Sequence, residues 1–211
     1  MPLDGSRDVP VSVIPRLVFD APLDPATVGS DAFRLHSGEL RPGGTVSYSV
    51  VRRSITFTPS SSLRPRLAYR AALADGVRGI DGAAPDAPLA IVFVTGNADL
   101  GRPAAPPEPT FAGDVGPLLE ERCAPCHAGD RPAARLALWP PETLGAAAER
   151  RSDEWPGWAI LAPGSPEDSY LLYKVAGSPG LVGERMPPGG PPPTLDEALA
   201  LEIWIDRGAR R

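Results

Sequence analysis

Cys123-Ala124-Pro125-Cys126-His127 is the stretch that decides how the second half of the chain is interpreted. Two thiols stand three positions apart, and an imidazole follows directly. The chain of 211 residues has only two cysteines and two histidines, so this pentapeptide holds both thiols and one of the imidazoles. The spacing C-x-x-C-H is that of covalent c-type haem attachment, in which the histidine becomes the proximal iron ligand. The motif predicts one covalently attached haem c.

Met186 is the predicted sixth ligand of the iron. The only other methionine of the chain is Met1. Met186 lies in the proline-rich stretch Gly183–Pro193, where a methionine does not behave as filling for a helical core. A stiff loop holds a weak thioether–iron bond at a lower entropic cost than a flexible one. A soft sulfur ligand also favours Fe(II) and raises the reduction potential, which suits an electron carrier.

A helix is expected to lead into the attachment motif. Phe111, Val115 and Leu118 recur at the helical period, and Asp114 is the expected N-cap. Pro117 would then lie in the first turn, where its missing N–H has no helical partner anyway.

A second helix is expected at the C-terminal end. Thr194 and Glu197 have the spacing of a capping box, and Gly208 is a suitable C-cap. The expected apolar stripe consists of Leu195, Ala198, Leu199, Ile203 and Ile205.

The order of these features resembles a class I cytochrome c. A helix ending in C-x-x-C-H, the loop Met186-Pro187-Pro188 and a closing helix with Trp204-Ile205 carry the resemblance. The intervening Leu161–Ser169 and Tyr170–Tyr173 are similar to planctomycete-type cytochrome c modules. The resemblance covers residues 110–209 and implies an all-α cytochrome c fold. It also implies that Cys123 and Cys126 carry the haem, with His127 proximal and Met186 distal. Gly145 to Trp158 matches less regularly and is not placed.

Two other interpretations of the motif, a redox-active C-x-x-C and a zinc site, have less support. A thioredoxin-like C-x-x-C needs a βαβ context, which the flanking helix–loop–helix order does not supply. A structural zinc ion needs four ligands, and beyond the motif the chain offers only the distant His36. A lone histidine in a strand is far more often a surface or satisfied residue than a ligand, so His36 is not assigned to the iron.

Electron transfer is the expected function, and the protein is expected to be an electron carrier rather than an enzyme. A haem enzyme or sensor of peroxidase type would need a displaceable sixth ligand and an acid–base group, for which only Glu184 is near Met186. Arg185 could pair with a haem propionate or be a solvated loop residue. Trp155, Trp158 and Tyr173 could wall the haem pocket, although core packing is the default for all three.

Short strands separated by turn-forming residues are expected over residues 11–96. The predicted strands are Arg16–Asp20, Ala32–His36, Thr45–Val51, Ser54–Thr58, Leu67–Ala74 and Leu89–Thr95, with a hairpin around Arg52-Arg53. About seven short strands without helical periodicity predict an antiparallel sandwich of immunoglobulin-like architecture, and the chain has no cysteine pair there to cross-link it.

The same region resembles the Ig-like modules of bacterial surface proteins, the S-layer-type Big domains. The resemblance rests on Leu17-Val18-Phe19, Ile55–Pro59, Gly79-Ile80-Asp81-Gly82 and Val92–Gly96, and it covers nearly all of residues 10–97. It implies a spacer or presentation module rather than an active site. An adhesion or assembly module is the alternative in which this half carries the function.

The two halves are expected to be separate domains joined by a proline-rich linker. The predicted domains are an Ig-like β-sandwich over residues 1–97, a linker over 98–110 and a cytochrome c domain over 111–211. Clustered prolines favour an extended, semi-rigid chain that cannot support a packed core.

Charge and hydropathy limit the partners and the location. Residues 1–98 carry nine acidic and ten basic side chains, whereas residues 99–211 carry 17 and 11, so the haem half favours a basic or neutral redox partner. No basic cluster suggests nucleic acid, and no apolar run is long enough for a transmembrane helix. Haem attachment implies the periplasm or the outer cell surface of a bacterium, yet no export signal is visible at Met1–Gly5.

Overall fold

A computed structural model describes residues 2–86, 89–104 and 107–211 of the chain. The chain divides into two compact units. The first comprises Met1–Tyr48 and Arg52–Ala105, and the second comprises Ser49–Val51 and Pro106–Arg211.

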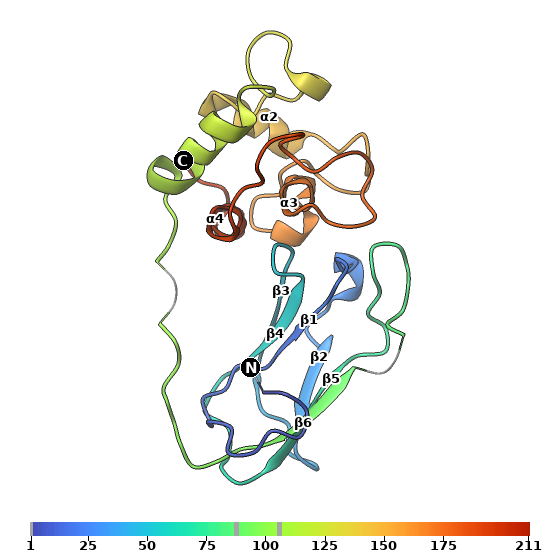
Figure 1. Cartoon of the computed structure of the whole chain (residues 1–211), viewed down its shortest axis with the longest axis vertical. Helices are drawn as coiled ribbons and strands as arrows, with labels where there is room; N and C mark the ends of the chain where they lie inside the picture. The colour runs from blue at the N-terminus through green and yellow to red at the C-terminus, as the bar shows by residue number, and fades with distance from the viewer. Residues whose placement is uncertain (1, 87–88, 105–106) are drawn as a thin grey trace. The chain divides into compact units, whose positions relative to one another are not determined.

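The first unit is a sandwich of two small sheets (Figure 1). Within the described residues the strands are β1 (Arg16–Val18), β2 (Phe33–His36), β3 (Gly44–Ser49), β4 (Ser54–Pro59), β5 (Ala68–Leu73) and β6 (Ala90–Val94). One sheet has the order β1-β4-β3 and the other the order β2-β5-β6. The pairs β1–β4, β2–β5 and β5–β6 are antiparallel. A short 3-10 turn, η1 (Pro25–Thr27), follows Asp24, whose carboxylate accepts the Ala26 N–H.

The sheets bury alternate side chains, which is why this sequence forms a sandwich. In β5, Tyr69, Ala71 and Leu73 are buried, whereas Ala68 and Arg70 face solvent. In β2, Phe33 and Leu35 are likewise buried. Alternate residues of a strand point to opposite faces, so each sheet has one apolar face, and these faces form a single buried cluster.

The predicted antiparallel Ig-like sandwich is therefore observed, with strand ends shifted by one or two residues from the predicted ones. The hairpin around Arg52-Arg53 is confirmed, because β3 and β4 are neighbours. β1 ends at Val18 rather than Asp20, because its partner β4 begins at Ser54, opposite Val18. The described residues form six strands instead of about seven. In place of a seventh strand, Val9 makes one parallel bridge with Thr95.

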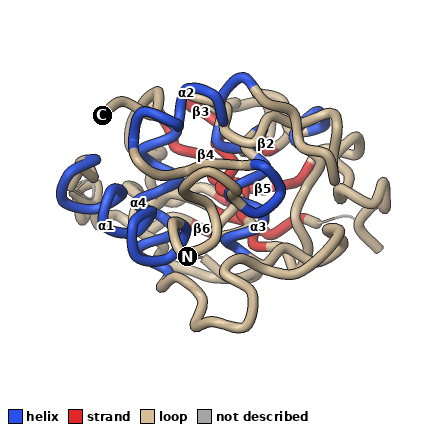
Figure 2. The backbone as a smooth tube through the Cα atoms, turned by 90° about the horizontal axis from the view of Figure 1, so that it is seen from above, coloured by secondary structure: helices blue, strands red, loops and turns tan. Residues whose placement is uncertain are grey.

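The second unit is helical, with long loops between short helices (Figure 2). Its first helical segment runs without a break through η2 (Phe111–Val115), α1 (Gly116–Leu118) and η3 (Leu119–Cys123). The remaining elements are η4 (Ala133–Arg135), η5 (Pro141–Thr143), α2 (Leu144–Glu149), η6 (Pro166–Asp168), α3 (Tyr170–Ala176) and α4 (Leu195–Asp206). No helix in the described part of the chain is long and apolar enough to cross a membrane.

The helix that leads to the C-x-x-C-H motif begins earlier than predicted. Its N-cap is Thr110, whose hydroxyl accepts the Gly113 N–H at 3.0 Å, and not Asp114. Asp114 instead accepts the backbone N–H of Thr110 at 2.8 Å. Pro117 consequently lies beyond the first turn. The helix is widened there, with the Gly116 N–H bonded to the carbonyl of Phe111, five residues earlier.

The C-terminal helix α4 has the predicted ends but a different buried face. The capping box between Thr194 and Glu197 is present. Beyond Arg207 the chain turns through Gly208, which has a φ of 90°, as expected for a C-terminal glycine. Leu195 was expected to be buried but is 53% exposed, because the first turn extends past the core. Leu201 is buried in its stead, and Trp204 packs on Phe111 with ring centroids 5.8 Å apart.

Candidate haem site

The three chemical groups of the C-x-x-C-H motif lie together because the helix continues into it. Cys123 is the last residue of η3. The N–H groups of Cys126 and His127 both donate to the Cys123 carbonyl, at 3.2 and 2.8 Å. Side chains three and four positions apart in such a turn lie on one side. Both cysteines are free thiols, and all three side chains line one cavity.

The His127 ring is held by the loop that follows the motif. Its Nδ1 lies 3.1 Å from the carbonyl oxygen of Leu136. A carbonyl can only accept a hydrogen bond, so Nδ1 carries the proton and Nε2 has the free lone pair. Metal-binding histidines usually donate their second ring N–H in this way. The Leu138 N–H also donates to the His127 carbonyl at 2.8 Å. The geometry of His127 fits an iron ligand.

Met186 lines the same cavity, although it is far from the motif in sequence. Its loop is fastened to the end of α3 by two hydrogen bonds. The Met186 N–H donates to the Lys174 carbonyl at 3.0 Å, and Arg185 Nε donates to the Val175 carbonyl at 2.8 Å. All four predicted site residues, Cys123, Cys126, His127 and Met186, thus line one cavity.

The cavity has the apolar character expected of a site for a hydrophobic ligand. It contains about 1000 Å³ of empty space, including the part open to solvent. Its walls include Leu118, Leu138, Ile160, Leu171, Leu201 and Pro193. A porphyrin presents two broad apolar faces, so the residues present fit a haem.

Burial gives Cys123 a different character from a redox-active cysteine. Desolvation raises the pKa of the Cys123 thiol to about 11. The attacking cysteine of a thioredoxin-like motif has a lowered pKa instead. Within the described residues, no group of three or more His, Cys, Asp or Glu side chains lies close enough to hold a metal ion.

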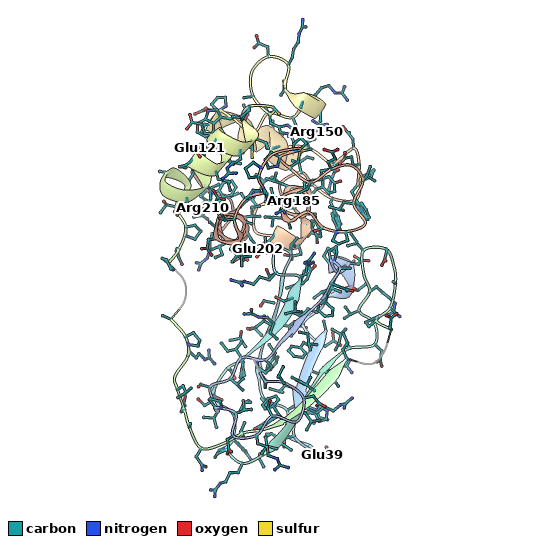
Figure 3. All side chains as sticks on the ribbon, in the orientation of Figure 1. Glu39, Glu121, Arg150, Arg185, Glu202 and Arg210 are labelled. Carbon is teal, nitrogen blue, oxygen red and sulfur yellow. The ribbon has the colours of Figure 1, made fainter. Side chains whose placement is uncertain are left out.

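Ionisable side chains from three elements stand at the polar edge of the cavity. Arg122, Arg150, Asp153, Glu154 and Lys174 are all among the lining residues. Arg122 donates to the Pro191 carbonyl at 3.1 Å and lies 3.6 Å from Glu197. Arg185, considered above as a partner for a propionate or a solvated residue, is bonded to α3 (Figure 3).

Glu154 is the centre of a small hydrogen-bonded network. Its Oε2 accepts from Tyr170 Oη at 2.7 Å and from Lys174 Nζ at 3.0 Å. The hydrogen bond from Tyr170, followed by the charge of Lys174, lowers the pKa of the Glu154 carboxyl despite some desolvation. Burial and the nearby carboxylate raise the pKa of Tyr170. Glu184, the acid–base candidate from the sequence, is not among the described residues that line the cavity.

The aromatic residues expected near the haem pack mainly on one another. The rings of Trp155 and Trp158 stack with centroids 5.3 Å apart, and the ring centroids of Trp158 and Tyr173 are 4.4 Å apart. Of the described aromatic side chains it is Tyr170, and not these three, that lines the cavity. The packing alternative is therefore the one observed for Trp155, Trp158 and Tyr173.

Sequence reasoning missed the polar residues around the site, namely Arg150, Glu154, Tyr170 and Lys174. Tyr170 and Lys174 are four positions apart in α3, so a helix predicted there would have placed them on one face. No local pattern indicates that Glu154 reaches them, because its segment has no regular periodicity. His36 lies in β2 of the first unit.

Comparisons with known proteins bear on the first unit. Residues 1–95 match the family model of the bacterial Ig-like domain Big_5. The chain is similar to the solved N-terminal part of the bacterial S-layer protein SbsC, at 17% identity and a TM-score of 0.34, over 44% of this chain and 23% of that one. It is also similar to the native conformation of E. coli alpha-2-macroglobulin, at 15% identity and a TM-score of 0.34, over 43% of this chain and 6% of that one.

This chain therefore spans less than a quarter of either structural neighbour. No curated protein matches it. By sequence and by sheet architecture, residues 1–95 are similar to a bacterial Ig-like domain.

Proposed function

We propose that the second unit is a c-type cytochrome domain that transfers electrons through one covalently attached haem. The observation that carries the proposal is the meeting of Cys123, Cys126, His127 and Met186 around one cavity with mainly apolar walls. The two thiols and the imidazole are neighbours in sequence, so the informative part is that the only internal thioether of the chain, 59 residues after His127, lines the same cavity.

Each residue of the site has a role that follows from its chemistry. Cys123 and Cys126 would hold the porphyrin edge through thioether bonds, and His127 would bind the iron through Nε2. The hydrogen bond from His127 Nδ1 to Leu136 fixes the ring orientation and makes the imidazole more basic. Met186 would be the distal ligand, held by its backbone bond to Lys174.

The bound haem would supply a one-electron Fe(III)/Fe(II) couple. The protein would keep water away from the apolar faces of the porphyrin and restrict the movement of His127 and Met186. The soft sulfur of Met186 favours Fe(II), which raises the reduction potential. An electron carrier needs an iron with no open ligand position, and His127 and Met186 would supply its two protein ligands.

The Ig-like unit is proposed to be a spacer or presentation module in the bacterial cell envelope, at the periplasmic or outer surface. Its similarity to a bacterial Ig-like domain supports this assignment, and so does the requirement that bacterial c-type haem be attached outside the cytoplasm. The acidic balance of residues 99–211 favours a basic or neutral redox protein as partner.

A visible spectrum of the exported protein in both redox states tests the proposal. The protein is produced with a c-type maturation system, and the expected spectrum is six-coordinate and low-spin with a Met–iron charge-transfer band. Haem that is extracted by acidified organic solvent would contradict covalent attachment. Met186→Ala should abolish the band and lower the potential, and an unchanged spectrum would remove Met186 from the site.

Ligand binding separates this function from a haem enzyme or sensor. A carrier with a firmly held Met186 should bind carbon monoxide slowly in the reduced state. Rapid binding by the wild type, or turnover of hydrogen peroxide, would favour the enzyme or sensor. The lowered pKa of Glu154 argues against its being a general acid near neutral pH.

A further inference from the structure

We propose that residues 150–154, here called the bracing segment, position both axial ligands of the haem, with Arg150 acting on His127 and Glu154 acting on Met186. The inference rests on the proposed cytochrome function. It assigns a role to a stretch whose sequence shows no regular pattern, between α2 and the loop that precedes α3.

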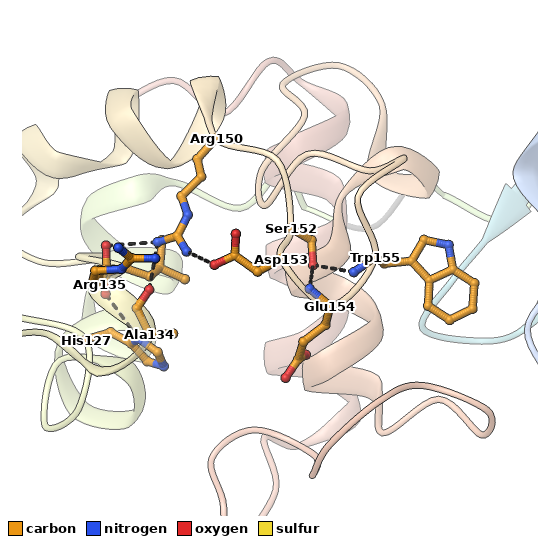
Figure 4. Close-up of polar contacts among 9 residues, drawn as sticks. His127, Ala134, Arg135, Arg150, Ser152, Asp153, Glu154 and Trp155 are labelled. Carbon is orange, nitrogen blue, oxygen red and sulfur yellow. Dashed lines mark hydrogen bonds and ion pairs between the residues drawn. The ribbon is translucent and has the colours of Figure 1, made fainter.

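Arg150 acts on the backbone next to the acceptor of the His127 hydrogen bond (Figure 4). Its Nη1 donates to the carbonyls of Ala134 and Arg135, at 2.8 and 2.9 Å. Both of those residues have positive φ, 52° and 53°. Residues other than glycine rarely adopt this backbone conformation unless their surroundings impose it, and the two hydrogen bonds from Arg150 are such a restraint. The next residue is Leu136, whose carbonyl accepts from His127 Nδ1.

Asp153 holds Arg150 in this position. Its Oδ2 lies 2.5 Å from Arg150 Nη2, and the Arg150 side chain is 24% exposed. The guanidinium therefore joins two backbone carbonyls to one carboxylate. Its planar set of donors suits this arrangement, and a lysine ammonium could not reproduce it.

Glu154 acts on the other ligand through Lys174. The Lys174 side chain is only 8% exposed, so its charge needs a close partner, and Glu154 supplies it at 3.0 Å. Lys174 Nζ also donates to the Val182 carbonyl at 2.9 Å, while the Lys174 carbonyl accepts from the Met186 N–H. Lys174 is thus joined to the Met186 loop at two points.

The bracing segment is itself fixed, which lets it position other groups. Buried Ser152 accepts from the N–H groups of Glu154 and Trp155, at 3.2 and 3.0 Å (Figure 4). Its own N–H donates to the Trp158 carbonyl. The Arg150 carbonyl accepts from the Ile160 N–H at 2.8 Å. The two ends of one fixed five-residue segment therefore contact the loop that holds His127 and the lysine that is bonded to Met186.

The test compares single variants of the exported holoprotein by two spectroscopic readouts. The first is the rate at which the His127 Nδ1–H exchanges with solvent in the reduced protein, measured by NMR. The second is the rate of carbon monoxide binding, followed together with the Met–iron band. Arg151→Gln is the matched control, because the Arg151 side chain donates instead to the nearby Gly157 carbonyl.

Arg150→Gln should speed the exchange of the His127 N–H by about tenfold or more and leave the Met–iron band intact. Arg150→Lys should give an intermediate exchange rate of the His127 N–H. This milder variant keeps the test possible if the glutamine variant does not fold. Glu154→Gln and Lys174→Met should weaken the band and speed carbon monoxide binding by about tenfold or more, with the His127 exchange rate unchanged.

The inference is overturned if the Arg150 and Glu154 variants match Arg151→Gln in both readouts. It is also overturned if every variant changes both readouts together, since that indicates general loosening. A wild type without covalent haem would refute the proposed function and this inference with it. A normal wild type with unaffected variants refutes the inference alone.

Discussion

A pair of core truncations tests whether the two units fold separately. Ile55 is fully buried in the sandwich, and Leu172 is fully buried in α3 of the helical unit. Replacing either by alanine leaves a cavity in one core and none in the other. Each substitution should therefore destabilise only its own unit.

The expected size follows from the burial of these side chains. Truncation of a fully buried isoleucine or leucine to alanine costs about 2–5 kcal/mol, and we take a loss of about 3 kcal/mol within that range. A unit of about 100 residues unfolds with an entropy near 0.2 kcal/mol/K, so a loss of about 3 kcal/mol lowers its Tm by about 14 °C.

Differential scanning calorimetry of the full chain is the assay. The wild type should show two transitions, one of which moves down by about 14 °C in Ile55→Ala and the other in Leu172→Ala. Ile55→Val, which costs about 1 kcal/mol, is the milder control and should move the same transition by about 5 °C. A single transition that moves in both alanine variants would refute the two-domain reasoning.

Three further predictions concern caps and buried polar groups. Thr194→Ala removes the N-cap of α4 and should destabilise the helical unit by about 1 kcal/mol in denaturant titration, whereas Thr194→Ser should be nearly neutral. The hydrogen bond from the backbone N–H of Thr194 lowers the pKa of Glu197 from its usual 4.5. The ionised carboxylate therefore contributes its full stabilisation above pH 4.5, and this contribution is lost as the pH falls through the lowered pKa. In Glu197→Gln the free energy of unfolding should fall less steeply as the pH is lowered. An equally steep fall in the variant would show that other groups cause it. Tyr69→Phe leaves the Arg64 N–H without its acceptor and should cost the Ig-like unit about 1–3 kcal/mol, measured by the midpoint of urea unfolding.

Local sequence patterns predicted the secondary structure correctly where it depends only on neighbouring residues. The alternation in Phe33–His36 places one face of β2 in the core, because successive strand residues point to opposite sides. The Thr194–Glu197 capping box depends only on atoms within one helical turn and was predicted correctly. The start of the first helix was placed wrongly because Thr110 and Asp114 can each cap, and only the folded backbone decides between them.

By itself the sequence determined the kinds of element and the chemistry of the attachment motif. C-x-x-C-H specifies thiols and an imidazole at a helical spacing, whatever surrounds them.

Only the tertiary structure decided that Met186 lines the same cavity as His127. Only the tertiary structure likewise decided that Arg150 and Glu154 line that cavity as well. These contacts join residues that are distant in sequence, and their geometry depends on loops without periodicity. Hydrogen bonds act over about 3 Å, so the partners of such a loop are chosen only when the whole unit has folded.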